Sequence, residues 1–171
     1  MKKLIGLVFC NLVYSCMTFN VAAQEIKADL IFELTADLIR PPVLAGMKII
    51  YPVTGGTFTG KINGNVLPIG GDFATFINPT TLKLDVRLVL QTEDSATIYC
   101  TYTGFLNTDA ETYKLIKAGK GFLIDPAKYY FRTNPIFETN SPKYDWLNYT
   151  ITVGFGTITP TGVTYKIYAI K

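Results

Sequence analysis

The sequence contains no histidine, and this absence excludes several kinds of active site at once. A Ser-His-Asp triad, a Cys-His pair and a metal centre with imidazole ligands all require this residue. Only Ser95 and Ser141 follow residue 23, and neither stands in a Gly-x-Ser-x-Gly setting. The chain also lacks a Walker loop and an EF-hand loop, and Gly154-Phe-Gly156 is too short for a dinucleotide fingerprint. We therefore expect neither nucleophilic hydrolysis nor a metal site, and we predict no cofactor.

The first 23 residues have the pattern of a secretory signal peptide. Lys2 and Lys3 form a basic start, and residues 4–14 form an apolar run interrupted only by Asn11. The small residues Val21-Ala22-Ala23 occupy the positions that a signal peptidase recognises. The pattern predicts cleavage after Ala23 and export to the periplasm or the medium.

Two alternatives to this cleavage exist. A retained membrane anchor needs about 20 apolar residues, and the run here is shorter. Lipoprotein processing at Cys16 would follow the bulky Tyr14. Cleavage after Ala23 would remove Cys10 and Cys16, so Cys100 would remain alone and no internal disulfide could form.

Charge is scarce in the predicted mature chain, residues 24–171. Removing 23 of the 171 residues leaves 148, and the loss of two lysines lowers the net charge from +3 to +1. No cluster of Lys or Arg remains. A net charge close to zero without a basic cluster argues against nucleic acid as a partner and, after cleavage, against a membrane surface. A chain of this length is long enough to bury a core without disulfides.

Short segments rich in Val, Ile, Thr, Tyr and Phe alternate with Gly and Pro throughout the mature chain. This pattern is typical of many short antiparallel strands in a single domain. One short helix is expected over 110–118, capped by Asp109 and ended by Gly119. Asn63-Gly64 is expected to form a two-residue hairpin turn. The expected strands span 27–38, 47–53, 57–62, 65–69, 72–77, 81–91, 96–105, 129–133, 144–155 and 163–170.

The expected fold is therefore all-β: an antiparallel closed β-barrel of about nine or ten strands with one short helix. Closure of the barrel would also remove exposed strand edges.

The predicted strands have two different faces. In 81–91, even-numbered positions are Leu or Val and most odd-numbered positions are polar or charged. Such period-two alternation is typical of a strand. In one interpretation the aliphatic face fills the barrel and the polar face meets water. In the other, the polar and aromatic face lines a ligand cavity, and the helix, loops or a second subunit cover the aliphatic face.

Seven stretches resemble one known family, and they follow its order and spacing over nearly the whole mature chain. They are Pro52-Val-Thr-Gly-Gly-Thr-Phe-Thr-Gly60, Gly64-Asn-Val-Leu-Pro-Ile-Gly-Gly-Asp72, Leu84-Asp-Val-Arg87, Gln91-Thr-Glu-Asp94, Tyr129-Tyr-Phe-Arg-Thr133, Pro135-Ile-Phe-Glu-Thr139 and Tyr144-Asp-Trp-Leu-Asn148. The family is the bacterial and fungal domain of unknown function 3237.

The resemblance implies a calycin-like barrel, related in shape to allene oxide cyclase, but no assigned reaction. It gives weight to Asp72, Asp85, Arg87, Arg132, Glu138, Trp146 and Asn148, and it favours the polar-aromatic cavity. One departure is Glu93-Asp94-Ser95-Ala96, where the family usually has Asp-Asp-Gly-Ala, so the geometry of this turn is open.

The available chemistry is that of carboxylates and arginines. Asp72 and Glu138 are candidate acid/base residues, because burial beside aromatic rings would raise the pKa of either carboxyl group. Arg87 or Arg132 could hold a carboxylate or an enolate through paired N–H bonds. The further predicted ligand-binding residues are Asp85, Tyr130, Trp146 and Asn148. Alternatively, Asp85–Arg87 and Glu138–Arg132 are structural ion pairs in the barrel wall.

Three functions fit these observations. The first is an exported barrel that binds a small-molecule ligand, an acidic or aromatic organic compound. The second is a cofactor-free isomerase, cyclase or lyase that uses a carboxylate and an arginine. The third is a structural module whose aliphatic face joins subunits into a homo-oligomer. Whether a reaction is catalysed is open at this point.

The most specific expectation concerns four residues. On each predicted strand the candidate residues are two positions apart, at 85 and 87, at 130 and 132, and at 144, 146 and 148. Since side chains alternate between the two faces of a strand, each set lies on one face. We therefore expect Arg87, Arg132, Trp146 and Asn148 to meet in one cavity. Because two nearby guanidinium groups repel each other, a carboxylate is expected within salt-bridge distance of one of them.

Overall fold

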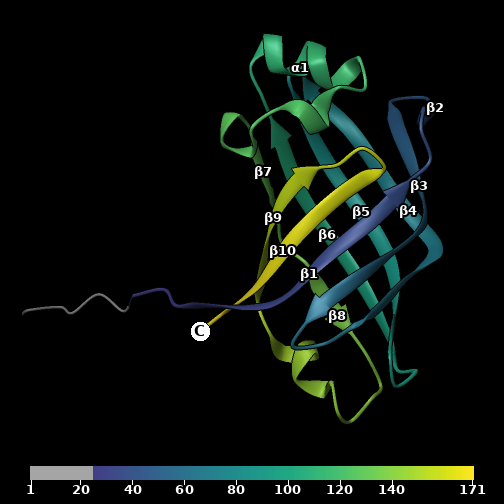
Figure 1. The fold of residues 1–171 in the computed structure, drawn as a ribbon, viewed down its shortest axis with the longest axis vertical. Coiled ribbons are helices and arrows are strands. Elements are labelled where there is room, and N and C mark those ends of the chain that lie inside the picture. The colour runs from purple at the N-terminus through teal and green to yellow at the C-terminus, as the bar shows by residue number, and fades with distance from the viewer. Residues whose placement is uncertain (1–24) are drawn as a thin grey trace, which may run out of the picture.

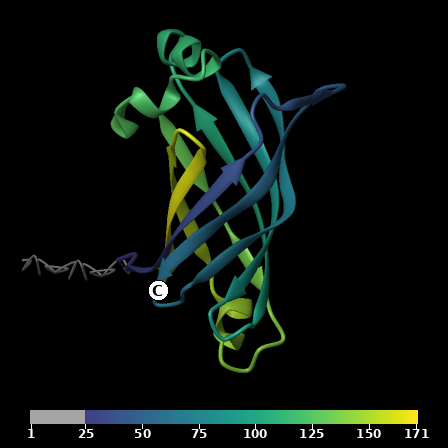
Figure 2. The same cartoon turned by 45° about the vertical axis from the view of Figure 1, so that its right-hand side comes forward.

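The barrel closes because strands near the two ends of the described chain pair with each other. A computed structural model describes residues 25–171. Strand β1 (Ala28–Leu38) pairs antiparallel with β10 (Gly162–Ile170) on one side and with β3 (Lys48–Gly60) on the other. These two pairings join the edges of the sheet, and Figures 1 and 2 show the strands wrapped around a common axis.

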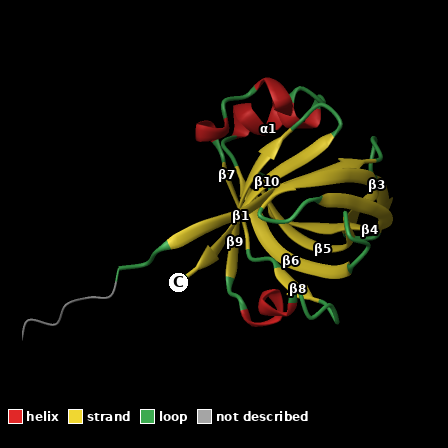
Figure 3. Ribbon diagram, turned by 60° about the horizontal axis from the view of Figure 1, so that its bottom comes forward, coloured by secondary structure: helices red, strands yellow, loops and turns green. Residues whose placement is uncertain are grey.

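Eight strands form the closed ring, in the order β1-β10-β9-β7-β6-β5-β4-β3. Two short strands lie outside it: β2 pairs with β3, and β8 pairs with β6. Figure 3 shows α1 and a 3-10 helical segment on opposite sides of the strands. The remaining elements are β2 (Val43–Ala45), β4 (Gly64–Asn78), β5 (Thr81–Thr92), β6 (Thr97–Asn107), α1 (Ala110–Lys117), the 3-10 helices η1 (Gly121–Leu123) and η2 (Pro126–Lys128), β7 (Tyr130–Thr133), β8 (Ile136–Glu138), the 3-10 helix η3 (Asp145–Tyr149) and β9 (Thr152–Ile158).

Over residues 25–171 the structure confirms the expected fold class, an all-β closed antiparallel barrel with one short α-helix. It also confirms the helix cap, because the Asp109 side chain accepts a hydrogen bond from the Thr112 N–H at 2.7 Å. A carboxylate at this position satisfies a free N–H group of the first turn and interacts favourably with the helix dipole.

The expected strand 144–155 is wrong over its first half. Residues 145–149 form η3, and only Thr152–Ile158 is a strand. The buried side chains are Tyr144 and Leu147, whose spacing of three fits one 3-10 turn. Local hydrogen bonds, including Leu147 N–H to the Tyr144 carbonyl at 3.0 Å, replace ladder pairing here.

The expected Asn63-Gly64 turn is also corrected. The β3–β4 hairpin exists, but Phe58 pairs with Gly64, so the loop is longer than two residues. The Asn63 side chain stabilises the loop by accepting a hydrogen bond from the Gly60 N–H at 2.9 Å. Gly60, rather than Gly64, takes a positive φ, of 154°.

Aromatic and aliphatic side chains fill the end of the barrel away from α1. Phe32 lies 5.3 Å from Phe58 and 5.7 Å from Phe137, measured between ring centroids. Leu90 and Cys100 are buried with the same core cluster. Cys100 is thus a small core residue with a free thiol, and burial raises the pKa of this thiol.

The predicted signal peptide, including Cys10 and Cys16, lies outside the described residues. Its cleavage therefore stays a prediction. Within residues 25–171, no helix has the length and apolar character needed to cross a membrane. The same residues contain no group of three or more Cys, Asp or Glu side chains placed to hold a metal ion.

Candidate functional site

The half of the barrel nearer to α1 encloses a cavity of about 640 Å³. This volume lies within the range of small-molecule sites, whereas packing voids in protein cores are seldom larger than a water molecule. The exposed residues of its lining include Arg40, Pro41 and Leu44, before and in β2, and Lys117 at the end of α1, so the mouth of the cavity lies between these segments. Figures 1 and 2 show α1 and β2 at the same end of the barrel.

The aliphatic face of β5 forms one wall of this cavity. Leu82, Leu84, Val86 and Leu88 all line it. The first interpretation of the two strand faces is therefore correct for β5, and the inverted one is wrong. The same finding removes the reason for expecting this face to join subunits, because the leucines are covered by the barrel itself.

Polar groups form a row across this apolar interior. Tyr51 on β3 pairs with Asp72 on β4, Asp72 pairs with Val86 on β5, and Val86 pairs with Tyr102 on β6. Directly paired residues of antiparallel strands point to the same face of the sheet. Asp72 and the two tyrosines therefore project into the cavity at one level, and all of them line it.

Asp72 is the only carboxylate among the residues lining this cavity. Its burial raises the pKa to about 7, and the negative charge of Asp85 acts in the same direction. The Asp85 backbone N–H opposes this rise by donating a hydrogen bond to Asp72 Oδ1 at 3.1 Å. Near neutral pH, both the protonated and the ionised forms of Asp72 are populated, so the group can donate or accept a proton.

Two tyrosines from opposite walls of the cavity meet inside it. The rings of Tyr102 and Tyr165 lie edge to face, with centroids 5.3 Å apart, and Tyr165 is also 5.3 Å from Phe131. Desolvation is the largest cause that raises both tyrosine pKa values, and the charge of Asp72 raises them further. Both hydroxyl groups are therefore neutral hydrogen-bond donors at physiological pH.

Two cations lie at the mouth of the cavity, Arg40 and Lys117. Arg40 Nη2 donates a hydrogen bond to the Gly162 carbonyl at 3.1 Å, which anchors the side chain beside the opening. Burial raises the pKa of Tyr51, and the charge of Arg40 opposes this rise. The site therefore has a cationic mouth, apolar walls and a titratable carboxyl group inside.

The structure places Arg87 on the outside of the barrel. It forms an ion pair with Asp85 at 2.7 Å, and about half of the Arg87 side chain is exposed. The expected carboxylate near one arginine is thus confirmed. The pair matches the structural alternative, and an exposed pair of this kind contributes about 1 kcal/mol or less to stability.

Arg132 also lies outside the cavity. Its guanidinium group stacks 4.1 Å from the Phe155 ring and 5.3 Å from the Tyr130 ring. It also donates a hydrogen bond to the Phe131 carbonyl at 2.9 Å. Tyr130 and Phe155 are themselves about half exposed, so the three side chains form a surface cluster.

The remaining predicted residues lie near the other end of the molecule. Glu138 is exposed on β8, and Trp146 is partly exposed on η3. Asn148 has a structural role: its Oδ1 accepts from the Thr139 N–H at 2.8 Å, and its Nδ2 donates to the Thr139 carbonyl at 3.0 Å. These bonds hold η3 against the segment that follows β8.

Of the eight predicted site residues, Asp72 alone lines the cavity. The expectation that Arg87, Arg132, Trp146 and Asn148 share one cavity in the barrel is corrected. Parity assigned Arg87 and Arg132 to a single face of their strands, but that face is the exterior, and Trp146 and Asn148 do not belong to a strand. A surface role of these residues in ligand binding stays a prediction.

Comparison with known proteins supports the barrel fold and assigns no function to it. The family described as "Protein of unknown function (DUF3237)" matches residues 26–170. The chain belongs to this family. A UPF0311 protein of Clostridium acetobutylicum is 32% identical over 155 residues, which cover 86% of this chain and 96% of that protein.

Two solved structures extend the comparison of this DUF3237 protein. A conserved protein of unknown function from Rhodopseudomonas palustris has a TM-score of 0.80 at 30% identity, covering 86% of this chain and 99% of that one. A β-barrel like protein from Acinetobacter baumannii has a TM-score of 0.70 at 34% identity, covering 86% and 98% respectively. Relatives with a similar barrel are thus known, and the family's function is unassigned.

Sequence reasoning did not find the cavity groups Arg40, Tyr51, Tyr102 and Tyr165 of this DUF3237 protein. Parity offered a signal for Tyr102, which alternates with the buried Ile98 and Cys100. The sequence does not distinguish a tyrosine that packs in the core from one that lines a cavity. Nothing in the sequence near Arg40 places it at the mouth, because the loop path decides this.

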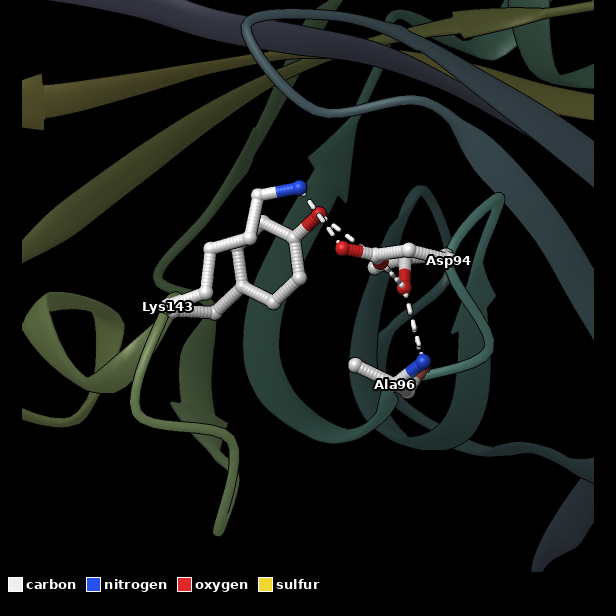
Figure 4. Close-up of polar contacts among 5 residues, drawn as sticks. Asp94, Ala96 and Lys143 are labelled. Atoms are coloured by element: carbon white, nitrogen blue, oxygen red, sulfur yellow. Dashed lines mark hydrogen bonds and ion pairs between the residues drawn. The ribbon is translucent and has the colours of Figure 1, made fainter.

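Asp94 in the β5–β6 turn is the most extensively hydrogen-bonded carboxylate of the described chain (Figure 4). It is not among the residues that line the cavity. It accepts hydrogen bonds from Lys143 Nζ at 2.6 Å, from Tyr144 Oη at 2.9 Å and from Thr92 Oγ1 at 2.5 Å. The Lys143 contact is the largest cause that lowers the Asp94 pKa. Asp94 therefore ties the turn to the segment before η3.

The turn that departs from the family pattern keeps a glycine-like backbone. Ser95 has φ 67°, the one positive φ at a non-glycine residue in the described chain. The Ala96 N–H donates to Thr92 Oγ1 at 2.9 Å, which helps to hold the turn (Figure 4). The substitution of glycine by serine is thus accommodated locally.

Proposed function

We propose that this protein binds a small, largely apolar organic molecule inside its barrel, as a ligand-binding member of the DUF3237 family. The observation that carries this proposal is the 640 Å³ cavity, which has apolar walls and the single carboxyl group of Asp72 inside. Such a combination of apolar surface and few convergent polar groups is typical of small-molecule sites. An aromatic ring system would satisfy the apolar walls.

The distribution of charge narrows the chemistry of the ligand. Arg40 and Lys117 at the mouth can hold an acidic group, whereas the Asp72 carboxylate would repel an anion further inside. The inner end is therefore suited to a neutral group that can share a hydrogen bond with a carboxyl or a phenol. This supports an acidic or neutral aromatic compound with its charged group directed outward.

A thermal-shift screen with aromatic acids, keto acids and their neutral analogues tests the proposal. A ligand at 100 times its Kd should raise the unfolding free energy by about 2.7 kcal/mol. Val86→Trp fills the middle of the cavity and should remove the shift. Val89→Trp lies on the same strand but on the opposite face, and should retain it. A shift that is equal in both variants, or no shift with any compound, would contradict the proposal.

The second candidate function is a cofactor-free isomerase, cyclase or lyase, and one observation favours it. Asp72 shares its cavity with an arginine, although that arginine is Arg40 rather than Arg87 or Arg132. The titratable Asp72 and the neutral tyrosine hydroxyls are the groups that acid–base catalysis requires. Turnover of a bound keto acid, lost in Asp72→Asn with binding intact, would distinguish this function from binding alone.

We also propose export, because residues 1–23 have the pattern of a signal peptide. Mass spectrometry of the protein made in a bacterial host would test this. A mature chain that starts at Gln24 is expected, and a chain that keeps residues 1–23 would contradict export by this route. A chain that starts at a lipid-modified Cys16 would instead support lipoprotein processing.

A further inference from the structure

We infer that the inner end of the cavity is a proton-transfer site for neutral ketones. Asp72 removes and returns a proton on the carbon next to the carbonyl group, and the Tyr102 hydroxyl, beside Tyr165, donates a hydrogen bond to the carbonyl oxygen. The inference rests on the proposed function, because the ketone must first occupy this cavity. It adds a reaction class, a substrate class and an electrophilic partner for Asp72.

The arrangement of the strands provides the geometry. Asp72 and Tyr102 stand on β4 and β6 at the same level, with Val86 between them on β5. Strands lie about 4.8 Å apart, so the two backbones are separated by about 10 Å. Val86 is the shortest side chain in this row, and the space in front of it belongs to the cavity. A flat carbonyl compound can therefore lie between the carboxyl and phenol groups.

Asp72 is held as a base with one free oxygen. The Asp85 N–H binds Oδ1 at 3.1 Å, and no described group donates to Oδ2. A carboxylate held by one backbone donor keeps its orientation, while its second oxygen can approach a C–H bond. Burial raises its pKa to about 7, and a general base works best when its pKa lies near the working pH.

Tyr102 is suited to stabilise the negative charge that forms on the ketone oxygen. Its ring is buried against Tyr165, with centroids 5.3 Å apart. Burial and the contact with Tyr165 raise the pKa of Tyr102, so its hydroxyl group keeps its proton. A fixed neutral donor in a site of low dielectric stabilises an oxyanion more strongly than water does. Tyr165 touches no predicted reacting atom, so it is a positioning residue.

The proton balance of the step is closed. The Asp72 carboxylate accepts the proton, the C–H electron pair forms a C=C bond, and the carbonyl π electrons move to oxygen as an enolate. The enolate oxygen accepts a hydrogen bond from Tyr102. The Asp72 carboxyl group then returns the proton to the same carbon, or to the far end of a conjugated system, which shifts a double bond.

The test uses 2-tetralone, a neutral aromatic ketone, in D₂O. NMR follows the exchange of its α-protons for deuterium, and a thermal shift measures binding in the same samples. The wild-type protein should accelerate exchange by about 10²-fold or more over buffer, with a rate that rises with pH and levels off above the Asp72 pKa of about 7. Asp72→Asn and Tyr102→Phe should lose most of the acceleration while binding persists. Glu33→Gln removes an exterior carboxylate on β1 and should leave it unchanged.

Each other outcome has a defined meaning. Binding without accelerated exchange overturns the proton-transfer site and leaves the binding proposal intact. Acceleration that survives in Asp72→Asn overturns the role of Asp72. If 2-tetralone and other neutral ketones do not bind but aromatic acids do, the substrate class is wrong and this inference fails alone. If nothing binds, both proposals fail.

Discussion

Replacing Asp72 by asparagine should stabilise the protein at high pH and have little effect at low pH. Burial raises the Asp72 pKa from 3.8 to about 7. The folded state therefore holds this proton over a range of pH in which the unfolded state has lost it. Between these two values, stability falls as the pH rises.

The magnitude follows from the two pKa values. Each pH unit between them corresponds to about 1.4 kcal/mol, so an ionised Asp72 lowers the free energy of unfolding by about 4 kcal/mol at pH 8. Asparagine has nearly the same shape and keeps an oxygen that accepts the Asp85 N–H. It should therefore remove most of this penalty without leaving a donor unpaired.

Urea unfolding of wild type and Asp72→Asn at intervals from pH 4 to pH 8 measures this effect, with Trp146 as the single fluorescent tryptophan. The stability difference should be near zero at about pH 4 and should grow to a few kcal/mol by about pH 8. Glu33→Gln controls for the loss of one negative charge at an exterior position. A difference that stays constant across this range would refute the claim that Asp72 is ionised at a cost inside the barrel.

Three further changes test the structural roles assigned above. Asn148→Ala should lower the free energy of unfolding by about 1–3 kcal/mol, because both Thr139 backbone groups lose their partner; loss of ligand-induced stabilisation would instead place it in the binding site. Ser95→Gly should be more stable than Ser95→Ala by about 1 kcal/mol, because only glycine adopts a positive φ freely, and equal stability in chemical denaturation would contradict the turn geometry. Gly156→Ala should destabilise the fold by about 1–3 kcal/mol, because its Cβ would lie 2.5 Å from the Phe131 ring; an unchanged melting curve would show that this contact is looser than described.

The site was harder to predict from the sequence than the fold, and β5 shows why. Alternation over 81–91 correctly predicted a strand with an aliphatic and a polar face. It could not tell which face the barrel would enclose, because period two is the same for both choices. The resemblance to the family gave weight to the charged residues, and it therefore favoured the polar face as the cavity wall. That face proved to be the exterior, where Asp85 and Arg87 form an exposed ion pair.

The segment from Tyr144 to Thr152 shows a second limit. Its alternating polar and apolar residues matched a strand, but Asn148 binds the Thr139 backbone, which lies nine residues earlier in the chain. Such a contact competes with ladder pairing and favours a 3-10 turn. Local periodicity carries no information about it.

The sequence alone determined that this chain forms an antiparallel barrel of short strands, because β-branched and aromatic segments, turn residues and the Asp109 cap act over a few neighbouring positions. The tertiary structure decided which residues form the site. Tyr51, Asp72 and Tyr102 come from three strands, Tyr165 from a fourth across the barrel, and Arg40 from a loop at its mouth. Their meeting depends on the closure of β1 against β3 and β10. The pKa of Asp72 likewise depends on the burial that this closure creates. Neighbouring residues in the sequence therefore predict neither the composition of the site nor this pKa.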